Sequence, residues 1–353
     1  MSQANQVRRS NHFVAAGYLA AFTDKGTRKG VLQAYRRSEP EHPLEMTAES
    51  VAWEKELYTR RFDGRMLDDT LERRFAEDVE GPFLNIRNRF LVEAAERPGW
   101  RMLSLSREER EVVALYLAIQ HLRTPTERDA ANWLSDLAAI SIVRDVMAPG
   151  GTGRAFFQGL ADRELVESDF VAIATLLTGI ASRNARDQGH WLQVGLKLAP
   201  RLTRVIEELD WYLVGTPEGL NLPTCDMPLV CVTRGAEQGS FELGGGWAQR
   251  GFEATLALSS SVVLYLTRRH GDPSFLGTDT FARSVRLRTV AFAQNWVYSR
   301  TVDPELADLL AASSRPSYRI ELDGQYRDRS EAPASLEADL QQRGSKSVGW
   351  RYG

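Results

Sequence analysis

Cysteine is scarce in this sequence: its 353 residues include only two, Cys225 and Cys231. Two cysteines are too few for the disulfide framework that stabilises small secreted proteins. The paired Cys-x-x-Cys and His-Glu-x-x-His patterns that bind zinc are also absent. We therefore expect reduced thiols that serve in packing rather than in redox or zinc chemistry.

The sequence has little excess of charge of either sign. Its 44 basic and 47 acidic residues give a formal net charge of −3. Proteins that bind nucleic acid non-specifically do so largely through positive charge. The net charge therefore does not indicate a nucleic-acid partner, although a local basic patch would still allow one.

Long hydrophobic runs are missing as well. A membrane-spanning helix needs about 20 consecutive apolar residues, and no segment of this chain approaches that length. Arg8 and Arg9 precede an apolar run over residues 13–22, but Gly17 and Tyr18 interrupt it and no small-residue cleavage site follows. We expect no membrane partner and no export, which places the protein in the cytoplasm.

The common sequence signatures of nucleotide binding and of one large hydrolase class are absent too. The chain contains neither Gly-x-x-x-x-Gly-Lys-(Ser/Thr) nor Gly-x-Gly-x-x-Gly, the loops that bind phosphate groups. Gly-x-Ser-x-Gly, which carries the nucleophile of α/β-hydrolases, is also missing. These absences weigh against P-loop enzymes, dinucleotide-binding folds and α/β-hydrolases.

The sequence does have the composition of a globular protein, with 43% hydrophobic and 26% charged residues. From about residue 67 to 209 apolar residues recur at helical spacing, and short runs over about 210–270 predict strands. We expect a single α+β domain over residues 1–326. A polar tail over residues 327–353 is predicted to be poorly ordered.

Local signals set several helix boundaries in the middle of the chain. Ser106 with Glu109 forms a capping box, which predicts a helix running to about Leu122. Pro125 is expected to bend or restart that helix, and Gly81-Pro82 to kink or break an earlier one.

The two ends of the chain are predicted to share one sheet. Residues 11–22 have the spacing of a helix capped by Asn11, residues 31–35 of a strand, and residues 278–299 of another helix. The N-terminal strands are too few to be stable alone, so we expect them to join the C-terminal strands. The result would be a mixed or antiparallel sheet with the helical middle region packed on it.

Six short segments then form an ordered series of motifs. They are Asn11 to Asp24, Val51 to Tyr58, Leu71-Glu72 with Val79-Glu80, Gln120 to Pro125, Thr224 to Pro228, and Leu256 to Ser259. In this order, over roughly residues 11–300, they resemble the motifs of a large bacterial family of unknown function. That family opens with His-(Tyr/Phe)-Val-Pro and has a Thr-Ser-Asp-x-Pro loop. Ala15 and Cys225 depart from its pattern, since they replace a proline and a serine. The resemblance implies a site at these segments and no particular reaction.

The first functional hypothesis is a metal-assisted hydrolase of the phosphodiesterase or nuclease type. His12 would act as general acid or base, because imidazole is suited to proton transfer near neutral pH. Asp226, which the shared sheet would bring near His12, would hold a divalent cation together with Glu54 or Glu80. Oxygen ligands of this kind favour Mg²⁺ or Mn²⁺. Arg123 would stabilise the anionic transition state.

The alternative is a non-enzymatic binding or regulatory module, of the kind associated with defence systems. In that case the same residues form a structural network. His12 would tie the chain end to the domain by a hydrogen bond, and Asp226 would bond backbone amides in a turn. Arg123 would form a buried ion pair between two helices, for which Glu80 or Glu54 offers the carboxylate.

A lesser alternative comes from residues 183–190. Arg183 and His190, separated by six residues, resemble the catalytic motif of all-α ribonucleases in bacterial toxin and defence systems. The motif is short, Gly189 would weaken the helix that carries it, and the predicted strands argue against that fold.

Overall fold

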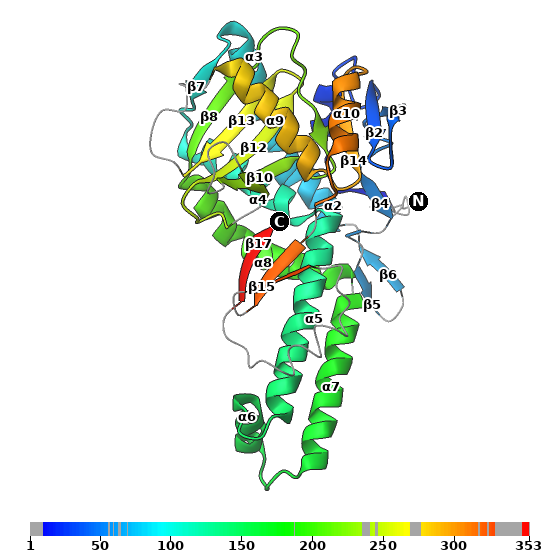
Figure 1. The fold of residues 1–353 in the computed structure, drawn as a ribbon, viewed down its shortest axis with the longest axis vertical. Coiled ribbons are helices and arrows are strands. Elements are labelled where there is room, and N and C mark those ends of the chain that lie inside the picture. The colour runs from blue at the N-terminus through cyan, green and yellow to red at the C-terminus, as the bar shows by residue number, and fades with distance from the viewer. Residues whose placement is uncertain are drawn as a thin grey trace, which may run out of the picture.

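The computed structural model describes residues 10–55, 57–58, 60–62, 65–68, 70–186, 188–234, 241–243, 246–268, 277–316, 318–322, 325–328 and 348–352. It has a body of antiparallel sheets and helices, as the α+β prediction requires. Two long helices, α5 (Pro125–Met147) and α7 (Glu167–Arg186), project from this body (Figure 1).

The largest sheet has six antiparallel strands in the order β11-β10-β12-β13-β8-β7. Their bounds are β7 Trp100–Met102, β8 Asp210–Gly215, β10 Leu229–Arg234, β11 Phe241–Leu243, β12 Phe252–Ser259 and β13 Val262–Thr267. Every residue of β12 and β13 is buried. Both faces of the sheet are therefore covered, which explains why these strands are almost continuously apolar.

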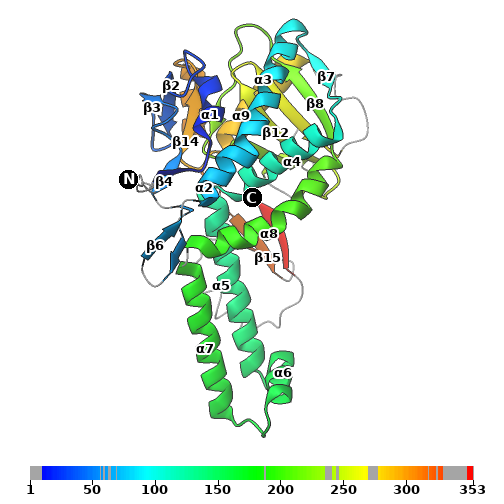
Figure 2. The ribbon, with the colours of Figure 1, turned by 180° about the vertical axis from the view of Figure 1, so that it is seen from behind.

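Helices cover the two faces of this sheet. On one face lies α9 (Thr278–Phe292), which is seen in front of the sheet in Figure 1. On the other lie α3 (Gly81–Glu96) and α4 (Arg107–Leu122), seen in front in Figure 2. The helix α8 (Gln188–Glu207) packs against α4 from outside.

The N-terminal strands do join later strands, but in a separate sheet of four. Its order is β3-β2-β14-β9, with bounds β2 Val31–Arg36, β3 Glu39–Thr47, β9 Thr224–Cys225 and β14 Trp296–Ser299. The prediction that strands from both ends share a sheet is therefore confirmed, but the strands over residues 229–267 lie in the other, six-stranded sheet. The strand β14 falls within the helix that was predicted over residues 278–299, and this helix ends at Phe292.

The first residues form a strand and not the predicted helix start. The strand β1 (Ser10–His12) pairs with β4 (Trp53–Lys55). The helix α1 covers only Ala16–Leu19 and is followed by a 3₁₀ turn. Asn11 is no helix cap: it is buried in β1, and its Oδ1 accepts the amide of Tyr58 at 3.2 Å.

The predicted kink at Gly81-Pro82 is a widened helical turn. The helix α2 (Thr70–Arg74), a π-helical stretch over Phe75–Glu80 and α3 follow one another without a loop. Pro82 has no N–H to donate to the preceding turn. The Gly81 amide instead donates to the Ala76 carbonyl, five residues back, which is the π pattern.

The capping box is confirmed. Ser106 Oγ accepts the amide of Glu109 at 3.2 Å, and Glu109 Oε2 accepts the amide of Ser106 at 3.1 Å. The resulting helix ends at Leu122, as predicted. The next helix restarts at Pro125, where the Thr124 side chain caps its first turn.

The helices α5 and α7, with the short α6 (Thr152–Leu160) at their far end and the two loops that join these helices, make up what we call the arm. Figures 1 and 2 both show it extending away from the sheets. The helices α5 and α7 pack along each other, and α6 packs on α5. No helix of the described chain is long and apolar enough to cross a membrane.

Smaller elements complete the structure. The helix α10 (Pro304–Ala312) lies against β3. Two hairpin strands, β5 Arg60–Phe62 and β6 Arg65–Asp68, follow β4, and a three-stranded sheet contains β15 Tyr318–Leu322, β16 Gln325–Asp328 and β17 Val348–Tyr352. Within the segment predicted to be a poorly ordered tail, β17 pairs with β15, and the order of the tail as a whole stays a prediction. Residues 329–347 lie outside the described chain.

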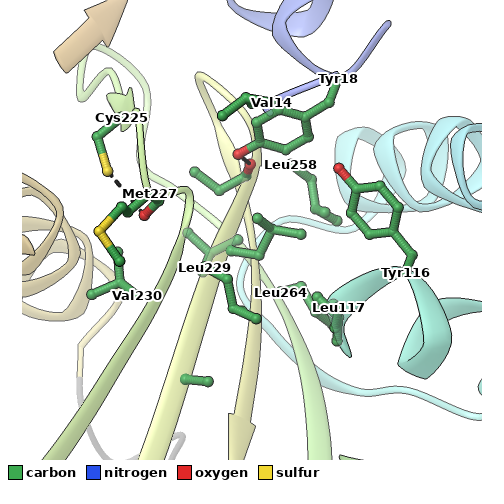
Figure 3. Packing of buried hydrophobic residues seen from close by; sticks show 14 of the residues in the cluster. Val14, Tyr18, Tyr116, Leu117, Cys225, Met227, Leu229, Val230, Leu258 and Leu264 are labelled. Atoms are coloured by element: carbon green, nitrogen blue, oxygen red, sulfur yellow. Dashed lines mark hydrogen bonds between the residues drawn. The ribbon is translucent and has the colours of Figure 1, made fainter. Parts of the chain in front are cut away.

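The core lies between the large sheet, α4 and the N-terminal segment. Figure 3 shows Val14 and Tyr18 from the N-terminal segment near Tyr116 and Leu117 of α4 and Leu264 of the sheet. Each of these five side chains is at most 1% exposed. The N-terminal segment is therefore anchored in the core, and this anchoring fixes the position of His12 next to it in sequence.

Both cysteines pack in the interior, as predicted. Cys225 and Cys231 are buried and neither is in a disulfide. Burial raises the pKa of both thiols well above its ordinary value. The Cys225 Sγ lies 3.0 Å from the Met227 carbonyl oxygen, to which it donates a weak hydrogen bond.

Candidate functional site

Five residues from four segments of the chain meet where α4 ends. Arg123, the residue after the last turn of α4, is 2% exposed. Its Nη1 donates to Glu80 Oε1 at 2.5 Å, and its Nε and Nη2 donate to Gln120 Oε1 at 3.2 and 2.6 Å. We call these three residues, with Tyr58 and His12, the Arg123 cluster. The predicted ion pair between Arg123 and Glu80 is confirmed.

The same cluster holds the N-terminal segment. Gln120 Nε2 donates to the Phe13 carbonyl at 2.9 Å. The Tyr58 hydroxyl lies 3.2 Å from the His12 carbonyl and 3.3 Å from the Arg123 carbonyl, so it can donate to either. Burial raises the pKa of this hydroxyl far above its ordinary value, which keeps it protonated as a donor. The backbone around His12 is therefore tied to α4 by Gln120, and the Tyr58 hydroxyl donates to a carbonyl on one side or the other.

The widened turn before α3 places the carboxylate of this cluster. Glu80 is the last residue of the π-helical stretch, one residue before Gly81. A π turn rotates the following residues relative to an α-helix. Glu80 is thereby directed at Arg123, and its side chain is 15% exposed. The sequence feature that allows this placement is Pro82, next to which the helix widens.

His12 is only partly enclosed. It lies opposite Trp53 in the β1–β4 pair, and its Nε2 is 3.2 Å from the Glu49 carbonyl. A carbonyl can only accept, so Nε2 carries the proton and Nδ1 is unprotonated in the neutral ring. Burial is the main cause that lowers the pKa of His12; Arg123 lowers it further, and Glu80 opposes the shift. The imidazole is therefore neutral at pH 7.

Asp226 belongs to a different part of the body. Its Oδ1 accepts the amide of Gln294 at 2.9 Å, and its Oδ2 accepts the amides of Asn295 and Trp296 at 2.7 and 3.1 Å. Its carboxyl is 5% exposed, and burial raises its pKa although the three amides act in the opposite direction. These three bonds hold the turn that connects the end of α9 to the start of β14. Asp226 therefore stabilises this turn.

The two ends of the chain approach each other, as expected, whereas the predicted pairing of His12 with Asp226 is not among the contacts of the described residues. The Tyr18 hydroxyl lies 2.9 Å from Thr224 Oγ1, close in sequence to Asp226. His12, however, bonds the Glu49 carbonyl, and among the described residues no hydrogen bond or ion pair joins it to Asp226. The carboxylate is already satisfied by the backbone amides around Asn295.

The three carboxylates of the predicted metal site lie with separate partners. Glu80 pairs with Arg123, Glu54 with Arg128 at 2.6 Å, and Asp226 with backbone amides. Within the described parts of the chain, no three His, Cys, Asp or Glu side chains are grouped so that they could hold a metal ion. Each of the three carboxylates proposed for Mg²⁺ or Mn²⁺ thus has its own partner in the described structure, and binding of either ion stays a prediction.

Sequence reasoning overlooked a second buried guanidinium. Arg87 of α3 is 7% exposed, and its Nη1 donates to the carbonyls of Gly17 and Tyr18 at 3.0 and 3.2 Å. It thereby joins α3 to the end of α1. The signal was available, since Arg87 follows the buried Phe83 by four residues and precedes the buried Phe90 by three.

The ribonuclease-like motif is divided between two helices. Arg183 lies in α7, which ends at Arg186, whereas His190 lies in α8, which begins at Gln188. Their side chains are outside the described part of the structure, so the motif stays a prediction.

Comparison with known proteins identifies the family to which these elements belong. The model of a family described as "Protein of unknown function (DUF4238)" matches residues 10–303. The match extends from β1 through the sheets and the arm to the start of α10, and it confirms the resemblance seen in the sequence. Searches of curated proteins and of solved structures found no significant match. The chain belongs to the DUF4238 family of proteins of unknown function.

Proposed function

We propose that this protein is a non-enzymatic binding module, in which the Arg123 cluster and the Asp226 turn are structural. The burial of Arg123 is the observation that carries the proposal. A guanidinium that stabilises a transition state must reach the reacting group. Arg123 is 2% exposed, and its three nitrogen atoms donate to Glu80 and Gln120 within the protein.

Asp226 supports the same interpretation. Both of its oxygens accept backbone amides between Gln294 and Trp296. A carboxylate with three such donors is fully used in forming the turn and is poorly placed to orient a histidine or a cation. We therefore adopt the alternative in which these polar residues are structural and join the N-terminus to the rest of the domain.

A binding module needs a surface that the fold leaves uncovered. Fourteen large apolar side chains are exposed among the described residues, and seven of them lie on the arm. We propose that the body supplies stability and the arm supplies the contact surface.

Substitutions at His12 test the structural role. In His12→Ala the Glu49 carbonyl loses its donor and the packing around β1 is loosened, so we expect the free energy of unfolding to fall by about 1 kcal/mol. His12→Gln can still donate to that carbonyl and should lose less than half as much. His42 is exposed on β3, and His42→Ala is the control. Equal stability of His12→Ala and the wild type in urea unfolding would refute the proposal.

A hydrolase of the phosphodiesterase or nuclease type is the second candidate. It is favoured by one observation: His12 has a lowered pKa and lies within the electrostatic influence of Glu80. Such an imidazole is a competent general base through Nδ1. Purified protein should then hydrolyse bis(4-nitrophenyl) phosphate with Mg²⁺ or Mn²⁺ present. His12→Gln should abolish that activity at unchanged melting temperature, whereas absence of any wild-type turnover would count against this candidate.

A further inference from the structure

The middle of the helix α7 carries no charge on any of its faces. Residues 170–182 contain no charged side chain. A helix of this kind is ordinarily buried on all sides. In the arm, Phe170 and Ala174 are 2% and 7% exposed, whereas Leu176 is 59% and Ile180 41% exposed. One face of α7 therefore packs within the arm, and the opposite face is uncovered.

A groove lies at the border between the packed and the uncovered faces of α7. Its volume is about 510 Å³, and it is lined by Met147 of α5 and by Val171, Ala174, Thr175, Thr178 and Gly179 of α7. The lining is small or apolar, and a β-carbon placed on Gly179 would meet nothing within 4 Å. The bottom of the groove at Gly179 is therefore open, and large side chains of a partner can enter it.

A ridge lies beside this groove on the same helix. Leu176 and Ile180 are four residues apart, so they form one row on the surface of α7. Each follows a groove residue by one position, Thr175 and Gly179, and so lies about 100° further round the helix. A ridge of large side chains next to a groove of small ones is the arrangement by which helices pack together.

We propose that α7 binds a second copy of this chain, with the ridge of each copy in the groove of the other. This inference rests on the proposed binding function and names the partner. The contact would be isologous, because each chain supplies both the ridge and the groove. The two α5–α7 hairpins would then form a four-helix bundle around a shared apolar core.

The amount of exposed apolar surface agrees with such a dimer. The seven exposed apolar side chains of the arm are Ile142, Phe156, Leu160, Val166, Val171, Leu176 and Ile180. Together they expose on the order of 700 Å², so a second copy that covered the whole arm would bury close to the roughly 800 Å² per partner of a standard interface. Because residues 170–182 carry no charge, two copies of this face would not repel each other, and the face has no charge pattern that selects a different partner.

The test is the mass of the full-length protein in solution, measured by light scattering after size-exclusion chromatography. We expect a species of twice the 39.6 kDa chain mass at low micromolar concentration. Leu176→Glu should weaken dimerisation by roughly 100-fold or more, because it places a charge in an apolar contact. The control is Val92→Glu, at a helical side chain of α3 that is 59% exposed, and this variant should remain dimeric.

A second variant separates loss of dimerisation from loss of folding. Gly179→Glu adds a side chain where there is open space in the single chain, so its circular dichroism and melting temperature should match those of a folded protein. In the dimer the new side chain would block the groove, and we expect a monomer. A monomeric wild type at 100 µM, as expected if the arm binds another protein or a lipid surface, would overturn the proposal. So would a dimer that survives both variants. Neither result bears on His12, whose test measures unfolding alone.

Discussion

The body and the arm of this protein differ in what they bury. In the body, charged side chains are enclosed: Arg123 is 2% and Asp226 5% exposed, and each has internal partners. On the arm, large apolar side chains are open to solvent, with Phe156 61% and Leu176 59% exposed. A buried charge cannot reach a ligand. An exposed apolar face, in contrast, lowers the free energy when a partner covers it and removes it from water. The comparison separates residues that maintain the fold from residues that are placed to bind.

Removal of the buried guanidinium should have the largest effect. Arg123→Met leaves the Glu80 carboxylate without its cation and Gln120 Oε1 without its donors. We expect the free energy of unfolding in urea to fall by about 3–5 kcal/mol, the usual cost of breaking a buried ion pair from one side.

The arm offers a matched control for that substitution. Arg163 pairs with Asp169 at 2.7 Å, but its side chain is 62% exposed. Arg163→Met should cost less than about 1 kcal/mol, because water screens a surface ion pair. Similar losses for the two variants would contradict the difference drawn between body and arm.

The Asp226 turn should show the next largest effect. Asp226→Asn would place an amide NH₂ where one carboxylate oxygen now accepts amides, most closely those of Asn295 and Trp296. We expect a loss of about 2–3 kcal/mol in the same unfolding measurement, since buried donors are left unsatisfied. Asp308→Asn, at an exposed position on α10, is the control and should be neutral. If Asp226→Asn were equally neutral, the turn would not depend on this carboxylate.

The pH dependence of stability should report on His12. Burial lowers its pKa below the ordinary value of 6.5, so below about pH 6.5 the unfolded chain binds a proton that the folded chain does not. The contribution of His12 to stability is therefore complete above that pH and is lost as the pH falls through the lowered pKa. His12→Gln should show a flatter decline between pH 7.5 and 5 in urea unfolding. Parallel curves for wild type and variant would mean that His12 titrates normally in the folded protein.

The smallest effect on stability is expected on the arm. Ile180 is 41% exposed, so Ile180→Glu should change the unfolding free energy of the monomeric protein by less than about 0.5 kcal/mol. The measurement requires concentrations below the range of dimerisation. A loss above 1 kcal/mol would show that Ile180 is packed within a single chain, which would weaken the contrast with the body.

The parts of the fold that follow from local signals were predictable. The capping box at Ser106 and Glu109 and the restart at Pro125 give both boundaries of α4, because caps act within one turn. The start of β14 was not predictable in this way. Its position is set by Asp226, a residue about 70 positions earlier in the sequence, and no local pattern encodes a bond of that range.

The candidate site was predictable in part for the same reason. His12, Glu80 and Arg123 were identified from their side-chain chemistry and from the motifs that contain them, and the structure brings them together. Asp226 and Glu54 were identified equally well as residues, but their partners are backbone amides and Arg128. Residue type indicates that a buried charge needs a partner; only the fold determines which partner it has.

The most direct test of the structural role of the Arg123 cluster is a double-mutant cycle on Arg123 and Glu80. The unfolding free energies of wild type, Arg123→Met, Glu80→Gln and the double variant would be compared in urea at pH 7. We predict a coupling energy of about 2 kcal/mol, with the double variant more stable than Arg123→Met alone, because the unpaired carboxylate is then removed. Additive losses, with a coupling below about 0.5 kcal/mol, would contradict a structural ion pair at the centre of this protein.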